Sequence, residues 1–203
     1  MNTINKSELP APGTALAGGF FTGLIRSGDQ LVAIITAPKA TGQLQNRRTW
    51  GETGKRIDAD NCHDGRQNTV ALAAEGNTAA LEILALVIDG HADWYWPARD
   101  EKELQYRYLK PTAQENYCSF RDGANTHSVP VGHDYTKESP AQTTAEIFQA
   151  GNAEAFDEAW YWSSTQYSAN GAYVQDFSDG TQGNVHKDYD HCVRAVRRLL
   201  VIE

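Results

Sequence analysis

The sequence Asp93-Trp94-Tyr95-Trp96-Pro97-Ala98-Arg99-Asp100-Glu101-Lys102-Glu103-Leu104 joins an aromatic run to a charged one across a proline. Proline is tolerated in the first turn of a helix and not inside one, so Pro97 favours a helix that begins just after it. We expect this helix to run from Arg99 to Leu109 and to end before Lys110-Pro111. The tryptophans before it are expected to fill the core; the alternative for such aromatic side chains is stacking on sugars.

A second helix is expected upstream. Asn77-Thr78 is a plausible helix N-cap, and the apolar residues between Leu81 and Val87 predict a mostly buried helix that ends at Asp89-Gly90. Residues 39–69 are polar and lack apolar alternation, so we expect a long loop there.

The N-terminal part is expected to contain a hairpin. Residues 18–26 and 30–38 are rich in β-branched and aromatic side chains, and the turn-forming sequence Ser27-Gly28-Asp29 lies between them. Residues 1–13 contain two prolines and little apolar periodicity. We therefore expect an N-terminal arm or linker over 1–13 and one domain over 14–203.

Strands are expected again over 159–165, 172–177 and 191–201, the last two with the period-two alternation of half-buried strands. Residues 112–142 are loop-rich, and a short helix is expected from 143 to 150. The whole pattern predicts an α+β domain, with two helices packed on a small curled antiparallel sheet and long irregular loops.

Four ordered motifs carry a resemblance. The stretch 93–104 is similar to a D-W-Y-L-P-[AS]-x-[DE]-E-L signature, and three motifs follow it: Trp162-Ser163-Ser164-Thr165, then Ala172-Tyr173 with Phe177-Ser178-Asp179-Gly180, then Val193-Arg194-Ala195-Val196-Arg197. Over roughly residues 90–200 the chain resembles the C-terminal domain of the Legionella collagen-like adhesin, a domain of unknown function common in phage and prophage proteins. It departs from that pattern at Ala195, where many relatives have Cys or Gly, and at Trp96, where Leu is usual.

The resemblance implies a C-type-lectin-like fold and a binding role without enzymatic activity. We expect a module of a phage tail or tail fibre, or of a bacterial adhesin, that recognises a host-surface glycan or protein. The alternative is a structural virion component, a decoration or tail-assembly protein, that binds other virion subunits. The resemblance also suggests a homo-oligomer such as a homotrimer, and it leaves open whether a retroelement diversifies the C-terminal loops.

The balance of charges argues against nucleic acid as a partner. The chain carries 18 Lys and Arg against 26 Asp and Glu, a formal net charge of -8, which repels a phosphate backbone unless the basic residues gather on one face. No apolar run approaches the roughly 20 residues that cross a membrane, so no membrane insertion is expected. With no visible signal peptide, we expect synthesis in the bacterial cytoplasm and a final place in the virion or at the extracellular surface.

The ligand-binding surface is expected between Tyr167 and Tyr189, where the solvent-facing positions are polar or aromatic, a mixture typical of binding loops. The residues that we assign to it are Tyr167, Tyr173, Gln175, Asp176, Asn184, His186 and Tyr189. The hydroxyls of residues 163–165 are expected to bond loop backbone, with ligand recognition as the alternative.

No metal site is predicted. Asp58, Asp60, Asn61 and Asp64 crowd together, and a calcium ion needs several such oxygens at once. Their spacing does not reproduce an EF-hand loop, so we expect a solvated acidic loop, with a calcium site as the alternative.

No catalytic residues and no cofactor are predicted. Cys62, Cys118 and Cys192 have neither the spacing of a zinc site nor the number of a disulfide framework. An enzyme on the related sulfatase-activating scaffold would need reactive cysteines close together near the C-terminus, where only Cys192 lies.

Overall fold

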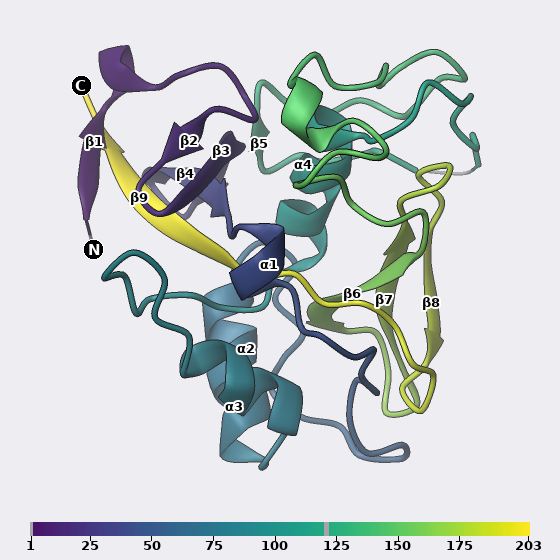
Figure 1. Ribbon diagram of the computed structural model, residues 1–203. Helices are drawn as coiled ribbons and strands as arrows, with labels where there is room; N and C mark the ends of the chain where they lie inside the picture. Colours follow the sequence, from purple (N-terminus) through teal and green to yellow (C-terminus); the bar gives the residue numbers. More distant parts are fainter. Residues whose placement is uncertain (1, 120–121) are drawn as a thin grey trace.

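The computed structural model describes residues 2–119 and 122–203, and it has a mixed α+β fold with two small sheets. The predicted fold class is confirmed at this level. Figure 1 shows one long helix, α4, between the two sheets. The larger sheet has six strands: β1 Thr3–Asn5, β2 Ala15–Leu16, β3 Gly19–Ser27, β4 Gln30–Thr36, β5 Ser128–Val129 and β9 Val196–Ile202. The smaller sheet consists of β6 Trp160–Gln166, β7 Gly171–Asp176 and β8 Gln182–His186. The helices are α1 Lys39–Gly42, α2 Gly65–Ala74, α3 Thr78–Leu84 and α4 Arg99–Leu109, with 3₁₀ turns at Lys6–Glu8 and Glu146–Phe148.

The predicted N-terminal hairpin is confirmed. Ser27 pairs with Gln30, so β3 and β4 are joined by the two-residue turn Gly28-Asp29. Gly28 has a φ of 60°, a left-handed conformation that glycine adopts without steric cost and that tight hairpin turns require. The order of the larger sheet is β1-β9-β4-β3-β2, with β5 paired to β3.

The expected arm over residues 1–13 is corrected at its beginning. Strand β1 pairs in parallel with β9, with Ile4 opposite Val201, and the Ile4 side chain belongs to the core. Figure 1 shows the two termini at this edge of the larger sheet. The pairing partner lies at the other end of the chain, so local composition held no sign of it.

Helix α4 begins and ends where the sequence predicted. It is stabilised at its start because Glu101 Oε2 accepts a hydrogen bond from the Ala98 backbone N–H at 2.8 Å, which satisfies one of the donors that a helix start leaves free. The helix has 11 residues, most of them buried. None of the helices in the described ranges is both long and apolar enough to cross a bilayer.

The region before α4 differs from the prediction. Part of the expected loop over 39–69 forms the beginning of α2, which is capped by Asp64 through a hydrogen bond from the Gln67 backbone N–H at 3.0 Å. Helix α3 begins after the predicted cap Asn77 but already ends at Leu84. Leu81 is 48% exposed because α3 lies at the surface and buries only its other side, and Val87, which follows the end of α3, is 68% exposed.

The C-terminal third forms its own sheet. Strands β6 and β7 match the predicted segments, whereas β8 was not predicted and β9 begins only at Val196. Because β9 pairs with β4 and β6 pairs with β7, the single curled sheet that we expected is divided into two sheets.

Tryptophans fix strand β6 to the rest of the core. Trp96 Nε1 donates to the Trp162 carbonyl at 3.0 Å, and Trp50 Nε1 donates to the Ser163 carbonyl at 2.8 Å. Trp94 and Trp96 are buried, as predicted, and Trp162 is buried as well. A buried indole that is also hydrogen-bonded contributes both apolar area and a fixed position, so β6 is firmly held.

Lys102 is a buried charge on α4 without a hydrogen bond. Its side chain is 1% exposed and its Nζ has no hydrogen-bond partner in the part of the chain that the structure describes. The nearest aromatic ring, that of Tyr161, lies 5.1 Å away. Burial and the nearby Arg194 guanidinium lower the pKa of Lys102 to about 7. Because the unfolded pKa is 10.5, the resulting destabilisation is full below pH 7 and fades as the pH rises toward 10.5.

We predict that Lys102→Met raises the free energy of unfolding at pH 7 by about 1–4 kcal/mol, because an apolar chain replaces a poorly compensated buried amine. The gain should shrink as the pH rises toward the unfolded pKa of lysine. Urea denaturation at several pH values measures both effects. Lys110→Met is the matched control: Lys110 Nζ donates to Gln114 O, Asn116 Oδ1 and Pro140 O, so its loss should destabilise. A Lys102→Met variant no more stable than wild type at pH 7 would contradict this account.

Candidate functional site

Strand β6 of the smaller sheet carries three hydroxyl side chains, in residues 163–165, that bond within the protein. Ser163 Oγ donates to the Tyr173 carbonyl at 3.1 Å, and Thr165 Oγ1 donates to the Asn61 carbonyl at 2.9 Å. Ser164 lies 3.4 Å from Asn68 Nδ2. All three hydroxyl-bearing residues are buried. The structural role expected for them is confirmed, and β6, the edge strand that pairs with β7, is held in a fixed position.

The strand register gathers several predicted residues on one face. Tyr173 pairs with Asn184, and Gly171 pairs with His186, and residues directly opposite each other project from the same face of a sheet. The ring of Tyr167 packs edge-on against that of Tyr173, with centroids 5.4 Å apart. We call the surface formed by Tyr167, Tyr173, Asn184 and His186 the β7–β8 face.

This face contains a cavity of about 380 Å³. Tyr167, Tyr173 and Asn184 line it, together with Arg99, Asp122, Ala124, Gln182 and Gly183. Tyr167 is 51% exposed. The volume is within the range of about 300–1,000 Å³ that is usual for small-ligand pockets.

Arg99 is the residue that the sequence argument missed. It is the first residue of α4, and its guanidinium carbon lies 5.3 Å from the centre of the Tyr173 ring. Its Nε donates to Asp100 Oδ1 at 2.8 Å. The nearby charges of Asp100 raise the pKa of Arg99 although burial opposes this, so the side chain is a permanent cation in the cavity wall. Its place after Pro97-Ala98 marked it as a helix start, and nothing in the local pattern pointed toward β7.

Four of the predicted ligand-binding residues do not line the cavity: Gln175, Asp176, His186 and Tyr189. Gln175 is 1% exposed and its Nε2 donates to the Tyr135 hydroxyl at 3.1 Å. Asp176 Oδ1 accepts hydrogen bonds from the Ser178 backbone N–H and hydroxyl, so it stabilises the turn after β7. Tyr189 is 55% exposed but does not line the cavity; its ring lies 6.4 Å from that of His186.

Gln175 is buried because residues between 122 and 135 cover one end of the small sheet. The Gly123 backbone N–H donates to Gln182 Oε1 at 2.9 Å, and the Gln182 backbone N–H donates to Asp122 Oδ1 at 3.1 Å. The period-two pattern correctly gave the face on which Gln175 lies. It held no information on a loop that folds over that face.

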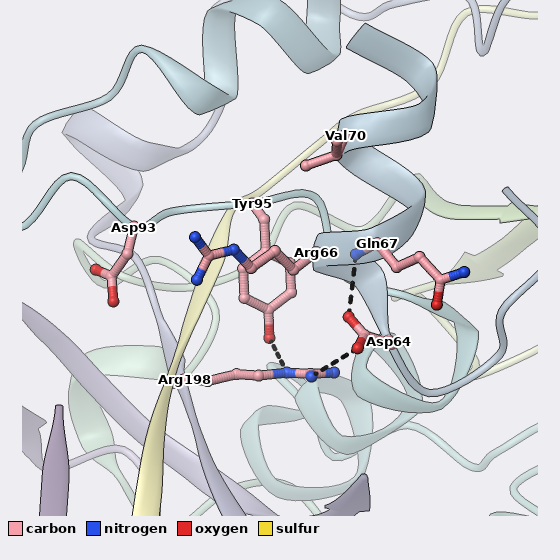
Figure 2. A pocket seen from close by; sticks show the side chains of 7 residues that line it. All are labelled: Asp64, Arg66, Gln67, Val70, Asp93, Tyr95 and Arg198. Atoms are coloured by element: carbon pink, nitrogen blue, oxygen red, sulfur yellow. Dashed lines mark hydrogen bonds and ion pairs between the residues drawn. The ribbon is translucent and has the colours of Figure 1, made fainter. Parts of the chain in front are cut away.

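A second cavity, of about 360 Å³, lies at the beginning of α2. Figure 2 shows Arg198 of β9 extending below the Tyr95 ring toward Asp64. Arg198 Nε donates to the Tyr95 hydroxyl at 2.7 Å, and Arg198 Nη1 is 3.3 Å from Asp64 Oδ2. At the other side of the cavity Asp93 pairs with Arg197 at 2.7 and 3.0 Å. These charges are engaged with one another, so the cavity is framed mainly by structural ion pairs.

The acidic segment before α2 also bonds within the protein. Asp60 pairs with Arg56 at 3.5 Å, Asn61 Oδ1 accepts two backbone N–H groups, and Asp64 caps α2. Across residues 2–119 and 122–203, no cluster of three His, Cys, Asp or Glu side chains is placed to hold a metal ion.

Two histidines stack beside this segment. The rings of His63 and His127 are 4.1 Å apart and inclined by 21°, and His127 Nδ1 lies 2.7 Å from Asp100 Oδ2. Burial and the charge of His127 lower the pKa of His63. Burial raises the pKa of the neighbouring Cys62 thiol, whereas a nucleophilic cysteine needs a lowered pKa.

Comparison with known proteins adds no assignment. The sequence matches no protein-family model, and no curated protein matches it either. The resemblance carried by the four motifs therefore stays a prediction.

The free energy of unfolding tests which of the predicted site residues are exposed and which are part of the core. Tyr167→Ala should change the free energy of unfolding by no more than about 0.5 kcal/mol, as for other exposed side chains. Gln175→Ala should cost about 1–3 kcal/mol because it removes a buried amide that bonds Tyr135. Urea denaturation of both variants makes the comparison. A larger loss of unfolding free energy in Tyr167→Ala than in Gln175→Ala would mean that Gln175 is not buried in solution.

Proposed function

We propose that this chain is a non-enzymatic binding module of a phage tail, tail fibre or bacterial adhesin, and that it recognises a host-surface glycan or protein through the β7–β8 face. The observation that carries the proposal is the cavity there. In the described part of the chain the Tyr167 and Tyr173 hydroxyls and the Asn184 amide make no hydrogen bonds. Their polar groups are thus available to a ligand, while their positions are fixed by the sheet.

The fold that we propose is a variant of the C-type-lectin fold. Three features support it: β1 pairs with β9, so that the two ends of the chain meet; α4 packs against both sheets; and the described stretches 43–64, 110–119 and 122–159 have little regular structure. The motif residues Asp93, Trp96 and Glu101 bond core partners, as a signature of a shared architecture would.

The chemistry of the titratable groups supports a role in binding. Burial raises the pKa of both Cys62 and Cys192, so neither thiol is activated. His127 shares a hydrogen bond with the buried Asp100 and stacks on His63, an arrangement that holds the chain around His127 against the residues just before α2. If several copies assemble, as in a homotrimer, shallow sites of modest affinity suffice because multivalency raises the avidity.

The proposal is tested on an array of glycans and of whole bacterial cells, probed with wild-type protein with and without calcium. We expect specific binding that calcium does not affect and that the Tyr167→Ala, Tyr173→Ala double variant reduces at least about tenfold, a loss of roughly 1.4 kcal/mol. The control is Tyr117→Ala, another exposed tyrosine, whose backbone bonds Asp179 at the opposite end of the sheet.

Equal loss in the control and the double variant, or binding that survives in the double variant, would rule out this site. Wild-type protein that binds no glycan and no cell would overturn the receptor role, and it would favour the alternative of a structural virion component.

A further inference from the structure

We propose that the ligand of the β7–β8 face is an acidic saccharide whose carboxylate is held by Arg99. This inference rests on the proposed function and names the ligand class of the same cavity. Members of this ligand class share a sugar ring that carries one carboxylate; uronic acids and sialic acids are two examples.

Arg99 is held in place from two sides. Its backbone N–H donates to Thr165 Oγ1 at 2.9 Å, and its Nε donates to Asp100 Oδ1 at 2.8 Å. Thr165 and Asp100 are themselves buried, and Asp100 is additionally bonded to His127. An arginine that is already oriented loses little conformational freedom when it binds a ligand.

The end of the guanidinium group remains available. Within the described residues neither terminal nitrogen of Arg99 has a hydrogen-bond partner, and the side chain is 28% exposed at the cavity. Two parallel N–H groups on a planar fork match a carboxylate in a bidentate pair. A neutral hydroxyl would use only part of this donor set.

The rest of the cavity fits a sugar ring. The Tyr173 ring lies beneath the Arg99 guanidinium, and the Tyr167 ring meets it edge-on. Aromatic rings provide an apolar body for the C–H face of a sugar, while the amides of Asn184 and Gln182 provide polar groups beside it. A carboxylate at Arg99 would set the orientation of the ring.

The remaining charges limit the ligand to few carboxylates. Burial raises the pKa of Asp122, and both its oxygens accept backbone N–H groups, from Ser119 and Gln182. The chain as a whole has a formal net charge of -8. Beyond about 8 Å such charges are screened at physiological salt, so one carboxylate at Arg99 is tolerated, whereas a dense polyanion would meet repulsion across a wider surface.

The test uses pairs of acidic and neutral saccharides. Glucuronate against glucose and galacturonate against galactose differ only in a carboxylate that replaces the C6 hydroxymethyl group, and sialyllactose differs from lactose by one sialic acid residue. Titration calorimetry with wild-type protein should show preference for one acidic member. Arg99→Gln should weaken that binding roughly 10- to 100-fold, the worth of a charged bidentate pair, and leave the neutral member unchanged. Arg99→Lys, which keeps the charge without the fork, should lie between.

Arg66→Gln is the control, because Arg66 is an exposed arginine at the second cavity; it should bind like wild type. Unfolding curves confirm that each variant is folded. Equal binding of acidic and neutral partners, or an acid preference that survives in Arg99→Gln, would overturn this inference. If the inference fails in this way but the Tyr167→Ala, Tyr173→Ala variant loses the binding of a neutral glycan or of a cell, the proposed function stands and only the acidic ligand class is wrong. No binding of any saccharide or cell would overturn both.

Discussion

The carboxylate of Glu101 is the buried charge around which this structure is organised. Its Oε1 accepts hydrogen bonds from the Tyr95 hydroxyl at 2.6 Å and from Arg198 Nε and Nη2 at 2.9 and 2.6 Å. Its Oε2 accepts the backbone N–H groups of Gly65 and Ala98 at 3.1 and 2.8 Å. Glu101 has no exposed surface, and a buried carboxylate is tolerable only when it is paired and fully hydrogen-bonded. One group thus joins β9, the start of α2, the aromatic stretch and α4; Figure 2 shows two of its partners, Tyr95 and Arg198.

This constraint fixes where the candidate site lies. Because Glu101 ties down the first turn of α4, Arg99 is held at the edge of the smaller sheet, over the Tyr173 ring. Trp96 reaches from the same stretch to the Trp162 carbonyl of β6. The side chains of the β7–β8 face therefore lie on elements that the core holds in place, while within the described residues the polar groups of Tyr167, Tyr173 and Asn184 remain without hydrogen bonds. A binding site built on rigid elements loses less entropy when a ligand binds.

The sequence predicted those parts of the fold that local pattern determines. The helix from Arg99 to Leu109 was predicted from the prolines on either side of it, and the hairpin around Gly28 from two β-branched and aromatic runs joined by a turn-forming sequence. Helix α2 was missed because its buried side includes Asn68 and Thr69 rather than an apolar stripe, and β8 was missed because it is polar and contains glycine. Tyr167, Tyr173 and Asn184 were correctly brought together on one surface. Gln175 was misjudged and Arg99 was missed because their surroundings depend on segments distant in sequence, residues 122–135 for the first and β7 for the second.

A double-mutant cycle on Glu101 and Arg198 tests most directly whether this buried ion pair holds β9, α2 and α4 together. Glu101→Gln and Arg198→Met should each lower the free energy of unfolding by about 3–5 kcal/mol, since each leaves the other charge buried without its partner. The double variant should cost less than the sum of the two by at least about 1 kcal/mol. Single variants that each lower the free energy of unfolding by less than about 1 kcal/mol, or effects that simply add, would contradict the account. They would mean that other interactions hold β9, α2 and α4 together.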